Sequence, residues 1–528
     1  MTGTLPADAL DTAPTLSQLS EASRYERFDL LQQRMLEVWS AMRLNQADES
    51  VVVIPSITLD RAVESSGSLN QAYEERYLFL LLLLRQPRLR MVYVTSMPIA
   101  PEIVEYYLAL LPGVIPSHAR SRLSLISVGD SSGASLSEKL LSRPRLLARI
   151  AAQIPNPRRS HLVPYNTTEL ERDVAISLGI PMYGADPRLA ELGTKSGCRR
   201  LFAEVGVPHP LGAEDLHSVE DVADAIIRMR RERPAMAEVI VKLDEGVSGA
   251  GNALVGLRGL GAPGEAGERD AVIARVRTLE LESPDVPREI YLAKLSEGGI
   301  VEERIAGQEV RSPSVQLQIT PGRTVELLST HDQLLGGPSG QSYLGCTFPA
   351  DPGYARMISA HASTIAERLV SLNVIGRFAF DFVVVRAANG TWSTYAIELN
   401  LRKGGTTHPF LTLQFLTDGR YDSDTAMFMT PAGAEKHLLA TDHLESERLR
   451  ALSISDLFDV VARHGLHFHQ ARQTGIVFHM ISCLTERGRV GLTAVGNSPA
   501  EAEAMYQRAR LILLDEAREA LTEGPMRV

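Results

Sequence analysis

Cysteine is scarce in this chain of 528 residues. Its three cysteines, Cys198, Cys346 and Cys483, lie far apart in the sequence. Three residues at such spacings exclude a disulfide framework and a cysteine-based zinc site. We therefore expect a protein of the reducing cytoplasm.

Long apolar runs and an excess of positive charge are also absent. The longest apolar run, Tyr77 to Leu84, is far shorter than the roughly 20 residues of a membrane-spanning helix. Charged residues flank this run, so it predicts a buried helix. The net charge of -10 argues against a general nucleic-acid binder. Residues 1–22 are polar and lack an apolar core, which predicts a flexible N-terminus without a secretory signal.

Short β-type runs alternate with helical patterns after residue 23. Such alternation is typical of a parallel sheet with crossover helices. The expected strands are 51–55, 91–95 and 123–128, and the expected helices lie near 70–85, 101–112 and 135–154. No G-x-G-x-x-G sequence follows the first strand, so a dinucleotide site is not supported. We predict a Rossmann-like domain over residues 23–190, with an unknown ligand.

The rest of the chain mixes strands and helices in a different pattern, typical of α+β domains. The expected elements are a helix at 218–232, strands at 238–243 and 252–257, β-rich sequence through 289–348, a helix at 355–372, and strands at 377–386 and 393–400. Two strands (475–484 and 489–495) and a final helix from Pro499 complete the sequence. The fold class is therefore α/β and α+β multidomain, with a core over 191–415 and a small α+β domain over 416–528.

Two of these strands carry acidic residues that are expected to converge. Asp381 lies within an apolar strand, and Glu398 and Asn400 are two positions apart on the next strand, so they face the same side. If the strands form a hairpin across the Asn-Gly pair between them, the two carboxylates meet. A pair of magnesium ions would compensate their charge. The alternative is an ordinary salt bridge to nearby arginines such as Arg377 and Arg402.

A lysine and a glycine-rich turn form a second group. Lys242 ends an apolar strand, where a lysine is costly unless it meets an anion. The turn that follows is able to wrap backbone N–H groups around phosphate. Its residues of interest are Gly246, Ser248, Gly249 and Gly251. Taken alone, such a segment is more often an ordinary turn.

The third group is the acidic segment 301–309. Its members Glu302, Glu303 and Glu309 are compatible with a solvated edge strand. A purine nucleotide is the other use for such a segment, because adenine needs backbone donors and acceptors and ribose hydroxyls suit a carboxylate. Further along, residues 331–333 and 336–341 either shape an acceptor pocket or form a plain turn and loop.

The order of these groups resembles the catalytic core of the ATP-grasp superfamily. The resemblance runs from about Lys195 to Pro409, and it is carried by TKSGCRRLFAEVGVPHP, VIVKLDEGVSGAGN, VEERIAGQEV, FAFDF and IELNLRKGG. It implies a carboxylate–amine ligase that uses ATP and two Mg²⁺ ions, for which Mn²⁺ can substitute.

The resemblance also implies a role for each matching residue. Lys195 and Lys242 would contact the nucleotide phosphates, and Arg402 would lie near the acyl phosphate. Backbone groups of the hinge would hold adenine, and the acid after the hinge glycine would hold the ribose. These hinge positions are Glu302, Glu303 and Ile305, followed by Glu309; the magnesium ligands are Asp381, Glu398 and Asn400.

Further segments resemble the pheganomycin-type peptide ligases within this superfamily. They are VPYNTTELERDVAISLGIPMYGADPRLAELGTKSG, STHDQLLGGPSGQSYLGC and GIVFHMISCLTERGRVGLTAVG. Those ligases have a pre-ATP-grasp domain, the core and their own C-terminal domain, and they join an amino-acid carboxylate to an amino acid or peptide. The resemblance implies small-molecule substrates, no nucleic-acid or membrane partner, natural product biosynthesis and a possible homodimer.

Two other classes remain as alternatives. A non-catalytic ATP-binding protein would keep the fold without turnover. An acyl-CoA or carboxylase enzyme would need a phosphohistidine or biotin-linked domain, which nothing in the sequence resembles. Measured ADP release with amino acids, with CoA and with neither separates these classes.

Four histidines near the C-terminus invite a zinc interpretation. They are His464, His467, His469 and His479. No carboxylate or cysteine lies at a supporting spacing, so we interpret them as ordinary surface or core histidines.

Overall fold

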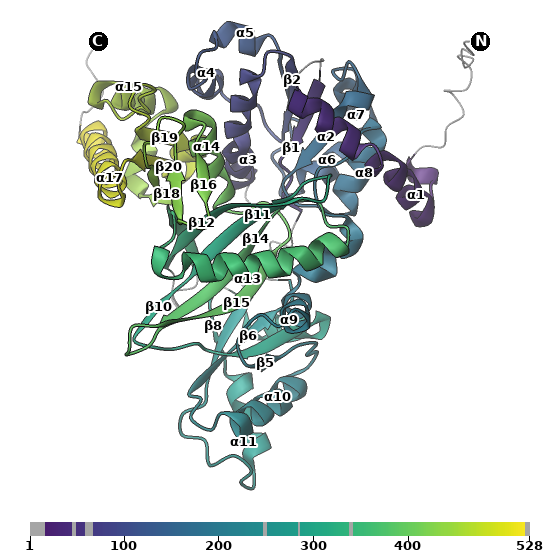
Figure 1. Cartoon of the computed structure of the whole chain (residues 1–528), viewed down its shortest axis with the longest axis vertical. Helices are drawn as coiled ribbons and strands as arrows, with labels where there is room; N and C mark the ends of the chain where they lie inside the picture. Colours follow the sequence, from purple (N-terminus) through teal and green to yellow (C-terminus); the bar gives the residue numbers. More distant parts are fainter. Residues whose placement is uncertain are drawn as a thin grey trace.

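The computed structural model describes residues 16–44, 49–58, 67–245, 251–283, 286–336 and 342–522 (Figure 1). Residues 1–15 of the predicted flexible N-terminus therefore lie outside the described residues. The remainder of that segment contains the short helix η2 (Leu16–Gln18) and the start of α1. None of the helices in the described ranges combines the length and the apolar character that crossing a bilayer requires.

The N-terminal part is a four-stranded parallel sheet with helices on its faces (Figure 1). The strands, in the spatial order β3-β2-β1-β4, are β1 (Glu49–Ile54), β2 (Leu89–Thr95), β3 (Leu123–Ser127) and β4 (Ser160–Pro164). Around them lie α1 (Glu21–Gln32), α2 (Met35–Leu44), α3 (Gly67–Glu75), η3 (Arg76–Arg85), α4 (Pro101–Ala109), α5 (Pro116–Arg120), α6 (Leu136–Leu141), α7 (Pro144–Ala151), η4 (Pro157–Arg159), α8 (Glu169–Leu178) and η5 (Pro187–Gly193). This arrangement confirms the expected parallel sheet with crossover helices.

The structure of this part differs from the prediction in two details. The apolar run at residues 77–84 is buried, as expected, but it forms the 3-10 helix η3 rather than an α-helix. Strand β4 was not predicted, because its sequence Ser-His-Leu-Val-Pro gives too short an apolar signal to stand out. It nevertheless completes the sheet by pairing with β1.

The next part is a five-stranded antiparallel sheet of order β5-β9-β6-β7-β8. Its strands are β5 (Gly212–Ala213), β6 (Glu238–Leu243), β7 (Asn252–Gly256), β8 (Glu280–Leu281) and β9 (Gly299–Glu303). Its helices are α9 (Lys195–Glu204), α10 (Val219–Glu232), α11 (Glu268–Arg277), α12 (Arg288–Lys294) and η6 (Leu295–Glu297). The prediction of β-rich sequence from residue 289 is wrong at its start. Tyr291 and Leu295 are buried four positions apart, which is the spacing of a helix face.

A nine-stranded sheet forms the largest layer of the molecule. Its spatial order is β10-β14-β11-β12-β13-β18-β20-β19, with β15 on the other side of β14. The first six strands in sequence are β10 (Glu309–Arg311), β11 (Pro313–Ile319), β12 (Val325–Gly336), β13 (Ser342–Phe348), β14 (Gly376–Arg386) and β15 (Trp392–Asn400). Helix α13 (Pro352–Ser371) crosses this layer (Figure 1) and buries Ile358, Ile365 and Leu369 against it.

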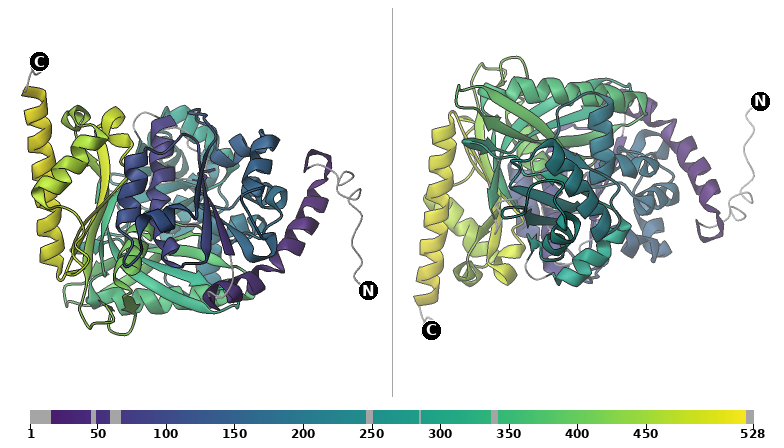
Figure 2. Two further views of the ribbon diagram at one scale, coloured as in Figure 1. Left: turned by 90° about the horizontal axis from the view of Figure 1, so that it is seen from above. Right: turned by 90° about the horizontal axis from the view of Figure 1, so that it is seen from below.

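The C-terminal strands continue the same sheet through the pairing of β13 with β18. The elements of this part are α14 (Thr407–Thr417), β16 (Arg420–Asp422), β17 (Met427–Met429), β18 (His437–Glu445), η7 (Glu447–Ala451), α15 (Ile454–His464), β19 (Gly475–His479), α16 (Cys483–Arg487), β20 (Arg489–Gly496) and α17 (Pro499–Thr522). The strand predicted at 475–484 ends at His479, because Met480 has a positive φ of 54° and α16 follows. Helix α17 lies at the outer edge of the molecule, opposite the N-terminal helices (Figure 2).

Candidate active site

One cavity of about 1240 Å³ is lined by residues from all of these parts. It is larger than the ~300–1,000 Å³ of ordinary small-molecule pockets, so it has room for more than one ligand. Ten of the residues singled out in the sequence line it. They are Lys195, Lys242, Gly251, Glu302, Glu303, Ile305, Asp381, Glu398, Asn400 and Arg402.

The hairpin expected from the sequence forms between β14 and β15. Its register places Asp381 opposite Glu398 and Ala379 opposite Asn400, with a bulge just after Asp381. The Asn400 side-chain amide donates to Oδ2 of Asp381 at 2.8 Å, and that of Gln333 donates to Oδ1 at 2.8 Å. The two carboxylates therefore meet on one face of the sheet, and two neutral amides hold one of them.

The charges of the Asp381–Glu398 pair favour the binding of a hard cation. Partial removal from water and the facing Glu398 carboxylate raise the pKa of Asp381 to about 7. Burial acts on Glu398 in the same direction, but its ion pair with Lys195, with Arg402 nearby, holds its pKa below the ordinary value. Two carboxylates and amide oxygens are the donors that Mg²⁺ accepts, so these residues fit the ion.

The two lysines reach the cavity from different elements. Lys195 is the first residue of α9, which Thr194 caps by accepting from the Gly197 N–H at 3.0 Å. Lys242 lies in β6 and forms an ion pair with Glu302 on the neighbouring strand β9. Each lysine is therefore paired with an acid of the site. A phosphate would compete for both lysines, because each side chain lies at the cavity wall.

The hinge segment leads from β9 into the cavity wall. Glu302 is buried, and besides Lys242 it lies 3.7 Å from the guanidinium of Arg199. Glu303 pairs with Arg233 and accepts from the Leu211 N–H at 3.0 Å. Their side chains are thus engaged in ion pairs with other residues of the protein.

Glu309 is the one described site residue that does not join this group. It lies in β10, outside the cavity lining. The Arg311 side chain donates to it at 2.8 Å, and Arg386 lies 3.4 Å from its other oxygen. Gly246, Ser248 and Gly249 lie outside the described residues. Gly251 lines the cavity, and its carbonyl accepts from the Leu243 N–H at 3.0 Å.

A cluster of arginines marks another section of the cavity. The guanidinium groups of Arg402 and Arg76 lie 5.8 Å and 6.0 Å from the ring of Tyr165. Arg489 from β20 also lines this section, and its Nε donates to the Asp442 carbonyl at 2.7 Å. Such a setting suits an anionic substrate group.

Sequence reasoning missed several of these residues. The sequence around Arg76 and Tyr165 does not mark either residue as functional, because each segment has the pattern of ordinary secondary structure. Gln333 belongs to the segment 331–333, for which a turn was one of two interpretations. That interpretation is wrong, because the segment lies inside β12. Its pairing with Asp381 depends on β12, β11 and β14 being neighbours, which no single stretch of sequence reveals.

Comparisons with known proteins agree with this architecture. The family described as "IQCH-like, ATP-grasp" matches residues 187–263 and 289–424, and "PGM1 C-terminal domain" matches residues 456–509. An ADP complex of N5-carboxyaminoimidazole ribonucleotide synthetase is similar with a TM-score of 0.51 at 10% identity, covering 89% of this chain and 98% of that one. Biotin carboxylase from Campylobacter jejuni is similar with a TM-score of 0.52 at 13% identity, covering 90% and 96%. The chain has the ATP-grasp fold.

Two curated proteins are similar over most of the chain. The L-propargylglycine–L-glutamate ligase of Streptantibioticus cattleyicolor is 27% identical over 493 residues, which are 89% of this chain and 97% of that ligase. The IQ motif-containing protein H of Danio rerio is 22% identical over 511 residues, which are 87% of this chain and 48% of that protein. The first of these is a ligase that the chain resembles over nearly its full length, so the resemblance to ATP-grasp ligases seen in the sequence is confirmed.

Proposed function

We propose that the chain is an ATP-dependent carboxylate–amine ligase, which joins an amino acid to an amino acid or peptide. The observation that carries the proposal is the facing pair Asp381 and Glu398, flanked by Lys195 in a cavity that also holds the arginine cluster. The name of the Streptantibioticus cattleyicolor relative, which joins an amino acid to glutamate, supports the same reaction class.

The site residues would bind ATP and hold its phosphates. Backbone groups near Ile305 would hold adenine, and Lys195 and Lys242 would exchange their carboxylate partners for phosphate oxygens. Asp381, Glu398 and Asn400 would hold two Mg²⁺ ions, for which Mn²⁺ can substitute. The ions supply positive charge where negative charge develops on the phosphates.

The reaction then follows from the charges in the cavity. A substrate carboxylate oxygen attacks the γ-phosphorus of ATP, and the bond between that phosphorus and the bridging oxygen breaks. ADP departs, and the substrate is now an acyl phosphate. The amine nitrogen attacks the acyl carbon, phosphate leaves, and the amine proton passes to solvent. Arg402 would stabilise the oxyanion of the tetrahedral intermediate. The cavity walls would limit hydrolysis of the acyl phosphate by excluding water.

The wider setting of this activity is part of the same proposal. A role in natural product biosynthesis, a cytoplasmic location and a homodimer would each fit a peptide ligase of this kind. The substrates would be small molecules with free carboxylate and amine groups. The arginine cluster would bind the carboxylate that is not activated.

The test is release of ADP and phosphate from the purified chain with Mg-ATP and pairs of amino acids or short peptides. We expect release that depends on one pair, and a product mass equal to that pair minus one water. Glu398→Gln should abolish release, whereas the control Asp224→Asn, in an exposed ion pair with Arg269, should not. ATP binding without release under any pair would favour the non-catalytic alternative, and no ATP binding would contradict the proposal.

A further inference from the structure

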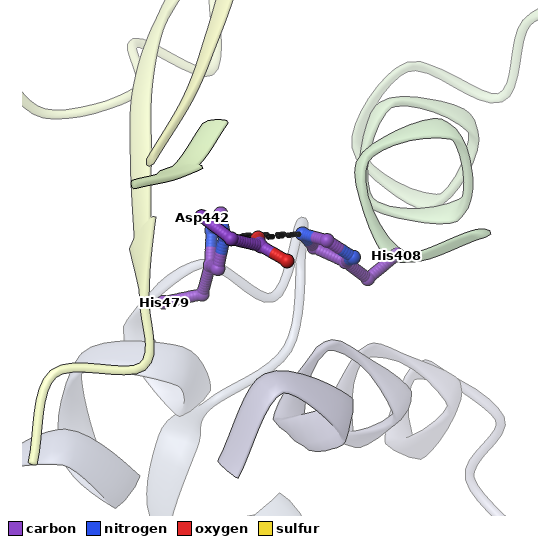
Figure 3. A group of neighbouring side chains, drawn as sticks. All are labelled: His408, Asp442 and His479. Atoms are coloured by element: carbon purple, nitrogen blue, oxygen red, sulfur yellow. Dashed lines mark hydrogen bonds and ion pairs between the residues drawn. The ribbon is translucent and has the colours of Figure 1, made fainter. Parts of the chain in front are cut away.

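Three side chains from separate elements converge beside the arginine cluster. His408 comes from α14, Asp442 from β18 and His479 from the end of β19 (Figure 3). All three are buried. Nε2 of His479 lies 2.7 Å from Oδ1 of Asp442 and 3.0 Å from Nε2 of His408, and His408 Nε2 lies 3.3 Å from the same Oδ1.

No single placement of protons turns all three contacts into hydrogen bonds. If both imidazoles are protonated at Nε2, two hydrogens converge on one carboxylate oxygen with their nitrogens 3.0 Å apart. If either lacks that proton, a nitrogen lone pair faces the carboxylate oxygen. A cation among the three atoms removes the conflict. Four tetrahedral ligands at zinc bond lengths are about 3.3 Å apart, close to the separations here.

The chemistry of the three side chains suits a metal. Two imidazoles and one carboxylate are donor groups that zinc and related metals bind, and their ligand atoms all lie within 4.8 Å of one another.

A contact from outside the cluster holds the Asp442 carboxylate in place. Nη1 of Arg76 donates to Oδ2 of Asp442 at 2.5 Å, which leaves Oδ1 directed at the two imidazoles. Such contacts commonly orient metal ligands. Arg76 also neutralises the only carboxylate in the cluster. The site therefore disfavours Mg²⁺ and Ca²⁺, which depend on several oxygen ligands, and favours a borderline metal that binds imidazole.

We propose that His408, Asp442 and His479 form a binding site for a divalent transition metal of the zinc class. The site is distinct from the Asp381–Glu398 pair, and it joins α14 of the core to the strands β18 and β19. Sequence spacing did not reveal it, because the three ligands come from segments far apart in the chain. The histidine group at 464–479 contributes only His479; His464 instead pairs with Glu516 at 2.8 Å.

The test measures retained metal on the full-length chain without a histidine tag. The protein is stripped with a chelator, loaded with Zn²⁺ in excess Mg²⁺, desalted and analysed by mass spectrometry for metal content. We expect about one zinc ion per chain. His408→Gln and His479→Gln should each retain less than about a tenth of that. His443→Gln, adjacent to Asp442 but outside the cluster, is the matched control and should keep the ion.

Two further measurements make the outcome decisive. Loading wild-type protein with Co²⁺ should give the visible absorption of a low-coordinate site, so the result stands even if a variant fails to fold. Glu398→Gln, which should lose ligase turnover, should keep its zinc, which separates this site from the proposed function. Absence of retained zinc and of the Co²⁺ absorption in the wild type overturns the proposal. So does retention of as much zinc by the two glutamine variants as by the wild type.

Discussion

Asp381 and Asp442 line the same cavity, yet their surroundings act on them in opposite directions. Loss of water alone would raise the pKa of both carboxyl groups. Asp381 faces another carboxylate and accepts from two neutral amides, and its pKa rises to about 7. Asp442 faces Arg76, and its pKa is held well below the ordinary value. The first acid faces a like charge, whereas one oxygen of the second is paired with a guanidinium of the protein.

The largest expected effect comes from removing the negative charge of Asp381. Asp381→Asn keeps the size of the side chain but removes one of the two facing carboxylates. The rate of substrate-dependent ADP release should fall by at least ~10²-fold, as when other groups that stabilise transition-state charge are removed. The measurement is a coupled ADP assay, with a circular dichroism spectrum to verify folding. Retention of more than a tenth of the rate would show that Asp381 is not needed for the chemistry.

Asp442→Asn should affect stability instead. It leaves Arg76 buried without its ion-pair partner, and breaking a buried pair in this way costs about 3–5 kcal/mol. Denaturant unfolding monitored by circular dichroism measures the change. The matched control is Asp224→Asn, because its ion pair with Arg269 at 2.8 Å is largely exposed. Exposed pairs contribute little, so the control should unfold like the wild type. Equal destabilisation of Asp442→Asn and Asp224→Asn would show that the buried ion pair contributes no more than the exposed one.

The difference between these two acids also marks what the sequence was able to predict. Asp381 and Glu398 lie on consecutive strands joined by a short turn, so local alternation and an Asn-Gly turn were enough to bring them together. Asp442 meets His408 and His479 only because β18 and β20 join the core sheet beside β13. Periodicity within a segment carries no information about such long-range pairing.

The successes and errors in the predicted fold have the same physical cause. Alternating strands and helices predicted the N-terminal parallel sheet, since each element buries a face of recognisable period. The C-terminal strands were recognised individually, but their continuation of the core sheet depends on the register of β13 with β18. Helix α12 was missed because it has only seven residues and Tyr291 is the one buried residue among them, which is too little to show a helical period.

A smaller effect should come from Arg76, which connects Asp442 to the cavity. Arg76→Lys keeps the charge but loses the planar guanidinium, which contacts both Asp442 and the Tyr73 ring, 4.9 Å away. Under the proposed function, we expect the KM of an amino-acid substrate to rise about tenfold, while the Kd for ATP stays unchanged. Steady-state kinetics and calorimetry separate the two quantities. The control is Arg463→Lys, which changes an exposed arginine that pairs with Glu516, and it should change neither value.

The smallest expected effect concerns Glu309, which the family resemblance assigns to the ribose of ATP. Its carboxylate is held by Arg311 and Arg386 outside the cavity lining, and exposed pairs of this kind contribute little. Glu309→Gln should therefore change the Kd for ATP by less than about fivefold, whereas Glu302→Gln, which removes the charge that pairs with Lys242, should change it more. Calorimetric titration with ATP compares the two variants. If Glu309→Gln weakens binding more than Glu302→Gln does, ATP must draw Glu309 away from its arginines, and the hinge then rearranges when nucleotide binds.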